Sequence, residues 1–172
     1  MNQLLIATTN RWKAKLFEPI MSHYGFEIIT LNRLKISGQT PVEDGRSVIE
    51  NALIKARHYH SSEYPWVFGD DTGLEIKALN GEPGVQSRRW AGCFPDDVDD
   101  KVWLDYLLER MKDVPIGERT AEFVDGWALI EPSGTVHTCE QRAVFEIALE
   151  PIRTLLPGLP VMSVAIGLPQ DP

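Results

Sequence analysis

The central stretch of the chain reads Phe68-Gly69-Asp70-Asp71-Thr72-Gly73-Leu74-Glu75. It follows the apolar residues 66–68 and precedes a second, partly apolar run, so the pattern predicts a strand that ends at an acidic pair. Two neighbouring carboxylates repel each other unless water, a cation or a proton lowers the cost, which suits Mg²⁺ binding or acid-base chemistry. The same residues are typical of a turn, because Asp and Thr accept hydrogen bonds from nearby amides and Gly accepts positive φ. Taken alone, the fragment favours the turn.

Length and charge limit the function classes. The chain has 172 residues and a net charge of −8, with a pI near 5.0. This length fits one domain, or two closely packed lobes, with a substantial core. The acidic surface repels phosphate backbones and argues against a nucleic-acid polymer as partner. A small phosphate ligand remains compatible, because a divalent cation and a few lysines can reverse the field inside one cleft.

Cysteine use and the N-terminus predict the compartment. Cys93 and Cys139 have neither the spacing of metal ligands nor that of a disulfide framework,. No basic leader is followed by a long apolar run, and no apolar run is long enough to span a membrane. We therefore expect a soluble, cytoplasmic protein with no membrane partner.

The first residues predict a strand, a polar turn and a helix. Residues 4–7 are apolar, Thr8-Thr9-Asn10 follow, and a helical pattern covers about residues 11–24. Asn10 is expected to cap that helix. Lys13 lies in its first turn, where the helix dipole disfavours a cation unless an anion shares the site. The position is a hint of anion binding, although an exposed lysine tolerates it.

A second helix is predicted after a strand at residues 28–31 and a polar loop at residues 35–45. Ser47 and Glu50 form a capping-box pattern at its start,. Its apolar face comprises Val48, Ile49, Ala52, Leu53, Ala56 and Tyr59,. Lys55 lies on the flank of that face, and the pattern alone favours a solvated lysine.

Two charged segments follow the central stretch. Arg88 and Arg89 stand beside Trp90, where they could bind an anion or pack as a surface pair on the ring,. The aspartates of residues 96–100 are interpreted as the start of a helix that runs to about Met111, since acidic side chains there complement the helix dipole. The predicted buried face of this helix is Val102, Trp103, Tyr106, Leu107 and Met111.

The last third is typical of β-structure. Strands are predicted at residues 120–124, 127–130, 135–140 and 142–148, with a turn at residues 132–134,. The tail from Pro151 is rich in proline, and only residues 161–166 could form a strand. Strands and helices that alternate and are then followed by hairpins predict an α/β or α+β fold with a mixed sheet.

Several blocks share their order and spacing with one known family. Residues 7–13 (Ala-Thr-Thr-Asn-Arg-Trp-Lys) are similar to a Thr-Gly-Asn-x-x-Lys phosphate loop, and residues 43–45 (Glu-Asp-Gly) to an acidic loop. Residues 50–56 are similar to a Glu-Asn-Ala-x-x-Lys-Ala helix, and residues 70–75, 78–85 and 87–92 are similar to the longest and most specific block. Together they resemble the inosine triphosphate pyrophosphatase family, which removes non-standard purine nucleoside triphosphates such as ITP, dITP and XTP. The similarity covers about residues 4–130 and reverses the preference for a simple turn at Asp70-Asp71.

The resemblance implies a fold and a reaction. It implies a single domain over residues 1–172, with two lobes around a long central mixed sheet, a nucleotide cleft between them, and a homodimer. The implied reaction is hydrolysis of a nucleoside triphosphate to the monophosphate and pyrophosphate, with water attacking the α-phosphorus. Such chemistry depends on positioning and charge neutralisation, so Mg²⁺ is the expected cofactor and Mn²⁺ a possible substitute.

The resemblance also assigns roles to residues. Glu43 and Asp71 are the expected metal ligands, since Mg²⁺ prefers carboxylate oxygens. Asp70 or Asp71 accepts the proton of the attacking water, and the sequence does not decide which. Lys13 and Lys55 hold the triphosphate, and Lys13 is also one of the expected catalytic residues. Further substrate contacts, some at the helix start where amides favour phosphate, are expected from Thr8, Thr9, Asn10, Arg11, Thr72 and Arg89.

Two departures from the family pattern affect the expected substrate. Thr9 stands where the family has glycine, and its side chain restricts the approach of the backbone to phosphate. Residues 151–172 form a divergent, shortened region without the Gly-Phe-Gly-Tyr-Asp-Pro segment, later lysine and Ser-His-Arg tail that carry base recognition in the family. This predicts a changed or relaxed base choice, a pocket supplied by a partner, or loss of activity. A non-catalytic or altered-specificity nucleotide-binding module is the alternative function.

Overall fold

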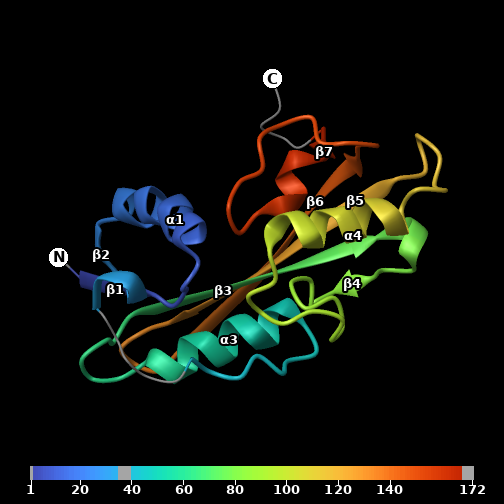
Figure 1. The fold of residues 1–172 in the computed structure, drawn as a ribbon. Coiled ribbons are helices and arrows are strands. Elements are labelled where there is room, and N and C mark those ends of the chain that lie inside the picture. Colours follow the sequence, from blue (N-terminus) through green and yellow to red (C-terminus); the bar gives the residue numbers. More distant parts are fainter. Residues whose placement is uncertain (1, 35–39, 168–172) are drawn as a thin grey trace. The chain divides into compact units, whose positions relative to one another are not determined.

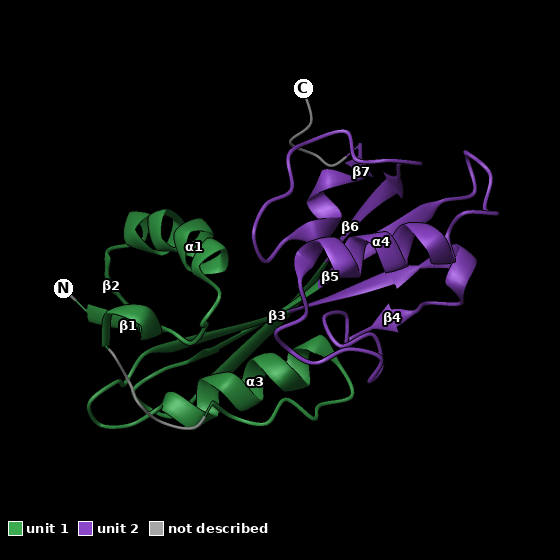
Figure 2. Cartoon of the chain, in the orientation of Figure 1, with its two compact units in different colours: residues 1–71, 125–141 green, residues 72–124, 142–172 purple. Residues whose placement is uncertain are grey.

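The computed structural model describes residues 2–34 and 40–167. The chain forms two compact units: the first contains residues 1–71 and 125–141, and the second contains residues 72–124 and 142–172 (Figure 2). Three long strands, β3 (Val67–Ile76), β5 (Thr120–Ile130) and β6 (Val136–Ile147), contribute residues to both units. That the whole chain is one domain with a divergent tail remains a prediction.

The strands form a mixed sheet (Figure 1). The remaining elements are β1 (Asn2–Ile6), α1 (Arg11–His23), β2 (Phe26–Thr30), α2 (Leu31–Leu34), α3 (Val48–Tyr59), η1 (Lys77–Leu79), β4 (Pro83–Gly84), α4 (Asp100–Arg110), η2 (Pro160–Ser163) and β7 (Ala165–Ile166). The strand order is β2-β1-β3-β5-β6-β7, and β4 pairs with β3. β1 runs parallel to β2 and β3, whereas β4 and β7 pair antiparallel with their neighbours. The predicted mixed α/β fold is confirmed.

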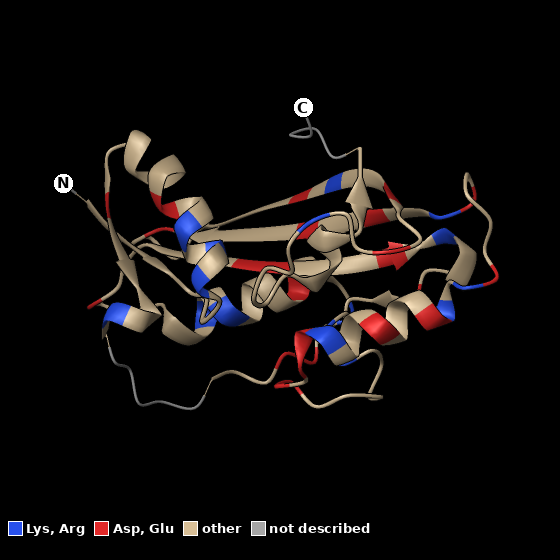
Figure 3. Ribbon diagram, turned by 45° about the horizontal axis from the view of Figure 1, so that its top comes forward, with Lys and Arg blue, Asp and Glu red and all other residues tan. Residues whose placement is uncertain are grey.

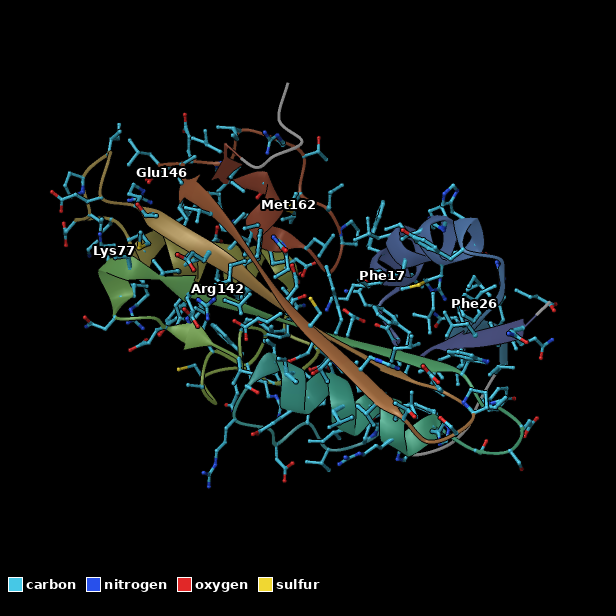
Figure 4. The ribbon with its side chains drawn as sticks, turned by 180° about the vertical axis from the view of Figure 1, so that it is seen from behind. Phe17, Phe26, Lys77, Arg142, Glu146 and Met162 are labelled. Atoms are coloured by element: carbon cyan, nitrogen blue, oxygen red, sulfur yellow. The ribbon has the colours of Figure 1, made fainter. Side chains whose placement is uncertain are left out.

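The core of the first unit lies on both faces of its sheet. Successive strand residues point to opposite faces, and they accordingly fall into two separate clusters. One cluster joins α1 to the sheet through Leu4, Ile6, Phe17, Ile28 and Phe68; Phe26, labelled with Phe17 in Figure 4, packs against it. The other joins α3 to the sheet through Leu5, Ala7, Ala52, Ala56, Val67, Ala128 and Ile130. Thus α1 covers one face and α3 covers the other (Figure 1).

Local capping explains where α1 and α3 begin. Asn10 Oδ1 accepts hydrogen bonds from the amides of Trp12 (2.9 Å) and Lys13 (3.3 Å), so the predicted cap is confirmed. At α3, Ser47 Oγ accepts from the amide of Glu50 at 3.2 Å. The Glu50 carboxylate accepts from the amide of Arg46, one residue before the cap, instead of the amide of Ser47. The capping box is therefore present with its second bond displaced.

Helix α3 approaches the sheet more closely than any side chain would allow. A Cβ atom added to Gly69 in β3 would lie 2.1 Å from the carbonyl oxygen of Ala52. A Cβ atom added to Gly126 in β5 would lie 2.5 Å from the carbonyl carbon of Val48. These two glycines thus let the backbone of α3 rest on the backbones of two strands.

The second unit has its own core. Its largest buried side chains are Trp90 and Trp103, whose ring centroids lie 5.3 Å apart. Leu74 and Ile76 of β3 and Phe145 of β6 belong to the same cluster. Within the described residues, 2–34 and 40–167, no helix is both long and apolar enough to cross a membrane.

Several predicted elements differ from the structure. The strands predicted at residues 120–124 and 127–130 are one strand, β5, and those at 135–140 and 142–148 are largely one strand, β6. Most alternate residues of β5 are buried along its whole length, whereas β6 is exposed over residues 136–142 and buried only near its end, at Phe145 and Ile147. Residues 161–166 form most of η2 and β7 instead of one strand.

One predicted packing contact is wrong. Val102 is exposed, and Leu104 takes its place on the buried face of α4. The guanidinium of Arg110 lies over the ring of Trp90, 5.7 Å from its centroid, and the side chain of Arg88 pairs with Asp100. The predicted polar loop at residues 35–39 and the end of the tail, residues 168–172, lie outside the described residues.

Candidate functional site

The acidic pair lies inside a strand. β1 ends at Ile6, which pairs with Phe68, and the amide of Ala7 donates to the carbonyl of Phe68 at 2.8 Å. Asp70 and Asp71 follow directly, beyond the last residue of β1, while β3 continues to Ile76. The predicted strand end and turn are therefore wrong. Inward-facing Leu74 and Ile76, together with pairing to β4, keep this segment extended.

The two aspartates point to opposite faces of the sheet. Asp70 shares its strand parity with Phe68, which packs on the α1 side, whereas Asp71 shares its parity with Val67 on the α3 side,. Both are buried, with 2% and 8% of their surfaces exposed. The sequence suggested that the two carboxylates repel each other within one turn. In the structure, each carboxylate is instead neutralised by its own partners.

Asp70 is compensated by the first helix. Lys13 Nζ lies 2.6 Å from Asp70 Oδ2, and the lysine side chain is 20% exposed. Asp70 Oδ1 is buried and has no hydrogen-bond partner among the described residues. Buried carboxylate oxygens are normally satisfied, so this atom is suited to accept a hydrogen bond from water or from a ligand.

Asp71 belongs to a second cluster, built around Lys55. The ammonium of Lys55 lies 2.9 Å from Asp71 Oδ1 and 3.0 Å from Glu43 Oε2. Burial opposes the charged lysine, but the attraction of Asp71 and Glu43 outweighs it, and the pKa of Lys55 is raised above its ordinary value,. The predicted metal ligands, Glu43 and Asp71, thus converge on one position where positive charge is favoured.

Asn51 is a member of this cluster that the sequence interpretation missed. Its Nδ2 donates to Asp71 Oδ2 at 3.0 Å, and its Oδ1 accepts from the amide of Gly45 at 2.8 Å. Asn51 precedes Lys55 by four residues, which places both on the same face of α3. The sequence could have indicated this, because the four-residue spacing within residues 50–56 places a polar residue on the same helix face as the candidate lysine.

The predicted phosphate loop lies at the start of α1. Thr8 is buried and its Oγ1 accepts from the amide of Asn10 at 3.2 Å, whereas Thr9 and Arg11 are exposed. The Asn10 side chain already occupies two amides of the first turn. A phosphate that used those amides would have to displace the Asn10 cap.

Two further predicted contacts belong to the second unit. Thr72 is half-buried, and its carbonyl accepts from Ser87 Oγ at 3.2 Å. Arg89 Nε lies 3.0 Å from Asp96 Oδ1. Their contribution to substrate binding remains a prediction.

The donor set can be tested against the chemistry of a divalent cation. Among the residues that the structure describes, no group of three or more His, Cys, Asp and Glu side chains is arranged as a metal site. Mg²⁺ is usually held by one or two carboxylates together with water and substrate phosphates. Glu43 and Asp71, which converge on one ammonium, fit that mode of binding.

Comparison with known proteins finds one family. The Ham1 family profile matches residues 4–154. A dITP/XTP pyrophosphatase from Corynebacterium efficiens is 40% identical over 154 residues, which cover 88% of this chain and 73% of the relative. A dITP/XTP pyrophosphatase from Photobacterium profundum is 37% identical over 123 residues, which cover 72% of this chain and 60% of the relative. The chain thus spans less than two thirds of the length of some curated relatives.

Solved structures give the same similarity. The crystal structure of a nucleoside-triphosphatase, or dITP/XTP pyrophosphatase, from Mycobacterium abscessus matches with a TM-score of 0.70 at 32% identity and covers 95% of this chain and 83% of that chain. A HAM1 protein from Coxiella burnetii matches with a TM-score of 0.76 at 28% identity and covers 96% of this chain and 81% of that chain.

Proposed function

Because the chain belongs to the Ham1 family, we propose that it hydrolyses non-standard purine nucleoside triphosphates, such as ITP, dITP or XTP, to the monophosphate and pyrophosphate. The observation that carries the proposal is the paired arrangement in the first unit: Lys13 on Asp70, and Lys55 on Asp71 and Glu43. Relatives named dITP/XTP pyrophosphatases support the substrate class.

Glu43 and Asp71 are the residues that would hold a divalent cation, and Mg²⁺ is the proposed metal. A bound Mg²⁺ would neutralise charge on the phosphates and lower the pKa of bound water. Both carboxylates are already oriented toward one point by Lys55. Little rearrangement of the backbone is therefore required for them to act together.

Lys13 and Lys55 are proposed to hold the triphosphate. Each ammonium is paired with a carboxylate in the structure and is partly shielded from water. A triphosphate offers both lysines an alternative anionic partner, and the exchange leaves the carboxylates available for a cation. Charge neutralisation of this kind is the main requirement of phosphoryl and nucleotidyl transfer.

The proton of the attacking water is proposed to pass to Asp70 or Asp71. Asp70 has one oxygen without a partner among the described residues. Both oxygens of Asp71 accept hydrogen bonds, one from Lys55 and one from Asn51. Single substitutions of the two aspartates separate these possibilities, as argued in the Discussion.

Cellular location and assembly are parts of the same proposal. We propose a cytoplasmic homodimer, on the basis of the family resemblance and of the cysteine pattern. The proposal leaves the preferred base open. A broad substrate panel is therefore needed.

The test of the function is a substrate panel combined with metal titration. ITP, XTP, dITP, dUTP, GTP and ATP are each incubated with Mg²⁺, with Mn²⁺, or with a chelator, and pyrophosphate release is measured. We expect release from at least one non-standard purine nucleotide, and its loss when the metal is chelated. No turnover of any nucleotide with either metal would contradict the proposal, and binding by calorimetry without turnover would favour the non-catalytic module.

A further inference from the structure

We propose that Asn51 is a positioning residue for the divalent-cation site: it orients Asp71 and fixes the loop that carries Glu43. The inference rests on the proposed function, because it concerns the same two carboxylates. It goes beyond that function by giving a role to a neutral side chain that contacts Asp71 without adding charge.

One carboxamide joins the two elements that carry the carboxylates. Asn51 Nδ2 donates to Asp71 Oδ2 on β3, and Asn51 Oδ1 accepts from the amide of Gly45 in the loop that follows Glu43. Asn51 is only 4% exposed. A buried amide that loses either bond leaves a polar atom unsatisfied, so both contacts are strongly favoured.

The backbone of Asn51 is held in place by the close packing of α3. Gly69 and Gly126 allow α3 to rest directly on two strands, with Ala52 and Val48 at the contact points. On the opposite side, a Cβ atom at Gly45 would lie 2.6 Å from Asn51 Oδ1. The short side chain of Asn51 therefore spans a fixed gap between the loop and the strand.

The two carboxylate oxygens of Asp71 have different partners. Oδ1 is paired with the Lys55 ammonium, whereas Oδ2 is paired with the neutral Asn51 amide. A divalent cation and the ammonium of Lys55 compete for the carboxylate of Asp71. The Asn51 amide is neutral, so its hydrogen bond does not neutralise the negative charge of that carboxylate. When Lys55 turns to phosphate, the Asn51 contact can persist and preserve the orientation of the carboxylate.

The experiment compares Mn²⁺ binding by the full chain in variants of two residues on the same helix. Asn51→Ala and Asn51→Leu remove both hydrogen bonds, and the leucine keeps a branched side chain of similar shape. Ser47→Ala is the matched control, because it removes the α3 cap at the amide of Glu50 and leaves the Asn51 contacts in place. Mn²⁺ binding is measured without nucleotide by electron paramagnetic resonance, and kcat and KM are measured for a nucleotide that the wild type hydrolyses.

We expect both Asn51 variants to bind Mn²⁺ about 10–100-fold more weakly than the wild type, as is usual when a partner of a metal ligand is lost. The fall in kcat should be of similar size, with little change in KM, whereas Ser47→Ala should bind Mn²⁺ like the wild type. Wild-type Mn²⁺ binding by folded Asn51→Leu overturns the proposal. An equal loss in Ser47→Ala overturns it too, because the effect would then follow general loosening of the helix.

A second variant keeps the proposal testable if the Asn51 variants do not fold. Gly45→Ala places a methyl group against Asn51 Oδ1 and should weaken Mn²⁺ binding in the same direction. Failure of the wild type to hydrolyse any nucleotide contradicts the proposed function but leaves the Mn²⁺ comparison decisive for Asn51. Absence of Mn²⁺ binding by the wild type overturns the role of Asn51 as well.

Discussion

Two aspartates that are adjacent in the sequence have separate surroundings in the structure. Asp70 faces α1 and pairs with Lys13, whereas Asp71 faces α3 and contacts Lys55 and Asn51. The separation follows from the alternation of side chains along a continuous strand. Each aspartate can therefore be changed without removing the partners of the other.

Substituting each aspartate by asparagine is expected to give two different losses. Asp71→Asn should abolish both turnover and metal binding while leaving the fold intact, since an amide oxygen binds Mg²⁺ poorly. Asp70→Asn should keep metal binding, and should lower kcat by about 10²–10⁴-fold if Asp70 accepts the proton. Metal titration, steady-state kinetics and thermal unfolding measure these effects. Near-normal activity in Asp71→Asn would remove Asp71 from the metal site.

At the scale of elements, the site depends on how closely α3 lies against the sheet. Gly69 and Gly126 have no room for a side chain, and both contacts are to the backbone of α3. The distance between the helix and the strand sets how far Asn51 and Lys55 must reach to contact Asp71. Two glycines thus connect the packing of the helix to the geometry of the carboxylates.

Gly69→Ala is expected to damage both stability and activity. Its Cβ would overlap the carbonyl of Ala52, and overpacking of this kind costs about 1–3 kcal/mol or more,. Gly25→Ala is the matched control, since its Cβ meets no atom within 4 Å and only the left-handed backbone conformation costs about 1–2 kcal/mol. Unfolding by denaturant and turnover are measured for both. Equal activity in the two variants would show that the close packing of α3 does not matter for the site.

Elements of the first unit were largely predictable, and the reason is local. Caps at Asn10 and Ser47 and the apolar periodicity of α3 depend on neighbouring residues, so the sequence alone located both helices. The continuity of β3 was not predictable, because Asp70-Asp71-Thr72-Gly73 has the composition of a turn and is kept extended by tertiary pairing. The contact of Asn51 with Asp71 was missed for the same reason, since the two residues are 20 positions apart in the sequence.

The second unit depends on one buried arginine that joins α4 to two strands. Arg119 donates to the carbonyl oxygens of Met111, Val114, Ile147 and Ala148. The residue is only 2% exposed. The ends of α4, β5 and β6 are therefore held together by a single guanidinium.

Arg119→Ala should lower the free energy of unfolding by about 3 kcal/mol or more, because several buried carbonyls lose their donor. Arg142→Ala is the matched control: Arg142, labelled in Figure 4, forms exposed ion pairs with Glu75 and Glu122. Such exposed pairs contribute about 1 kcal/mol or less. Urea unfolding of both variants measures the difference. A loss below about 1 kcal/mol for Arg119→Ala would contradict the structural role of its hydrogen bonds.

At the scale of the whole molecule, an acidic protein is proposed to bind a polyanion of small size. The net charge is −8, and acidic and basic segments are interspersed along the chain, as α4 illustrates (Figure 3). Lys13 and Lys55 supply positive charge inside this acidic background, each beside a buried carboxylate. This arrangement favours a metal-bound nucleotide over a nucleic-acid polymer.

The sequence segments that are similar to the family support hydrolysis of a phosphoanhydride bond more strongly than they support any preferred base. Candidate residues for the metal and phosphates lie within the first unit, in segments similar to the family pattern. Thr72 and Arg89 lie in the second unit, where their partners are Ser87 and Asp96. No motif in residues 151–172 identifies the side chains that select the base. A substrate panel is needed to determine the preferred base.

The proposed reaction is distinguished from other nucleotide hydrolysis by which phosphoanhydride bond is broken. The best nucleotide of the panel is incubated with the protein and Mg²⁺, and the products are identified by phosphorus NMR. The account predicts nucleoside monophosphate and pyrophosphate in equal amounts, with no reaction when Mg²⁺ is chelated. Nucleoside diphosphate with orthophosphate, or turnover that continues without a metal, would contradict it.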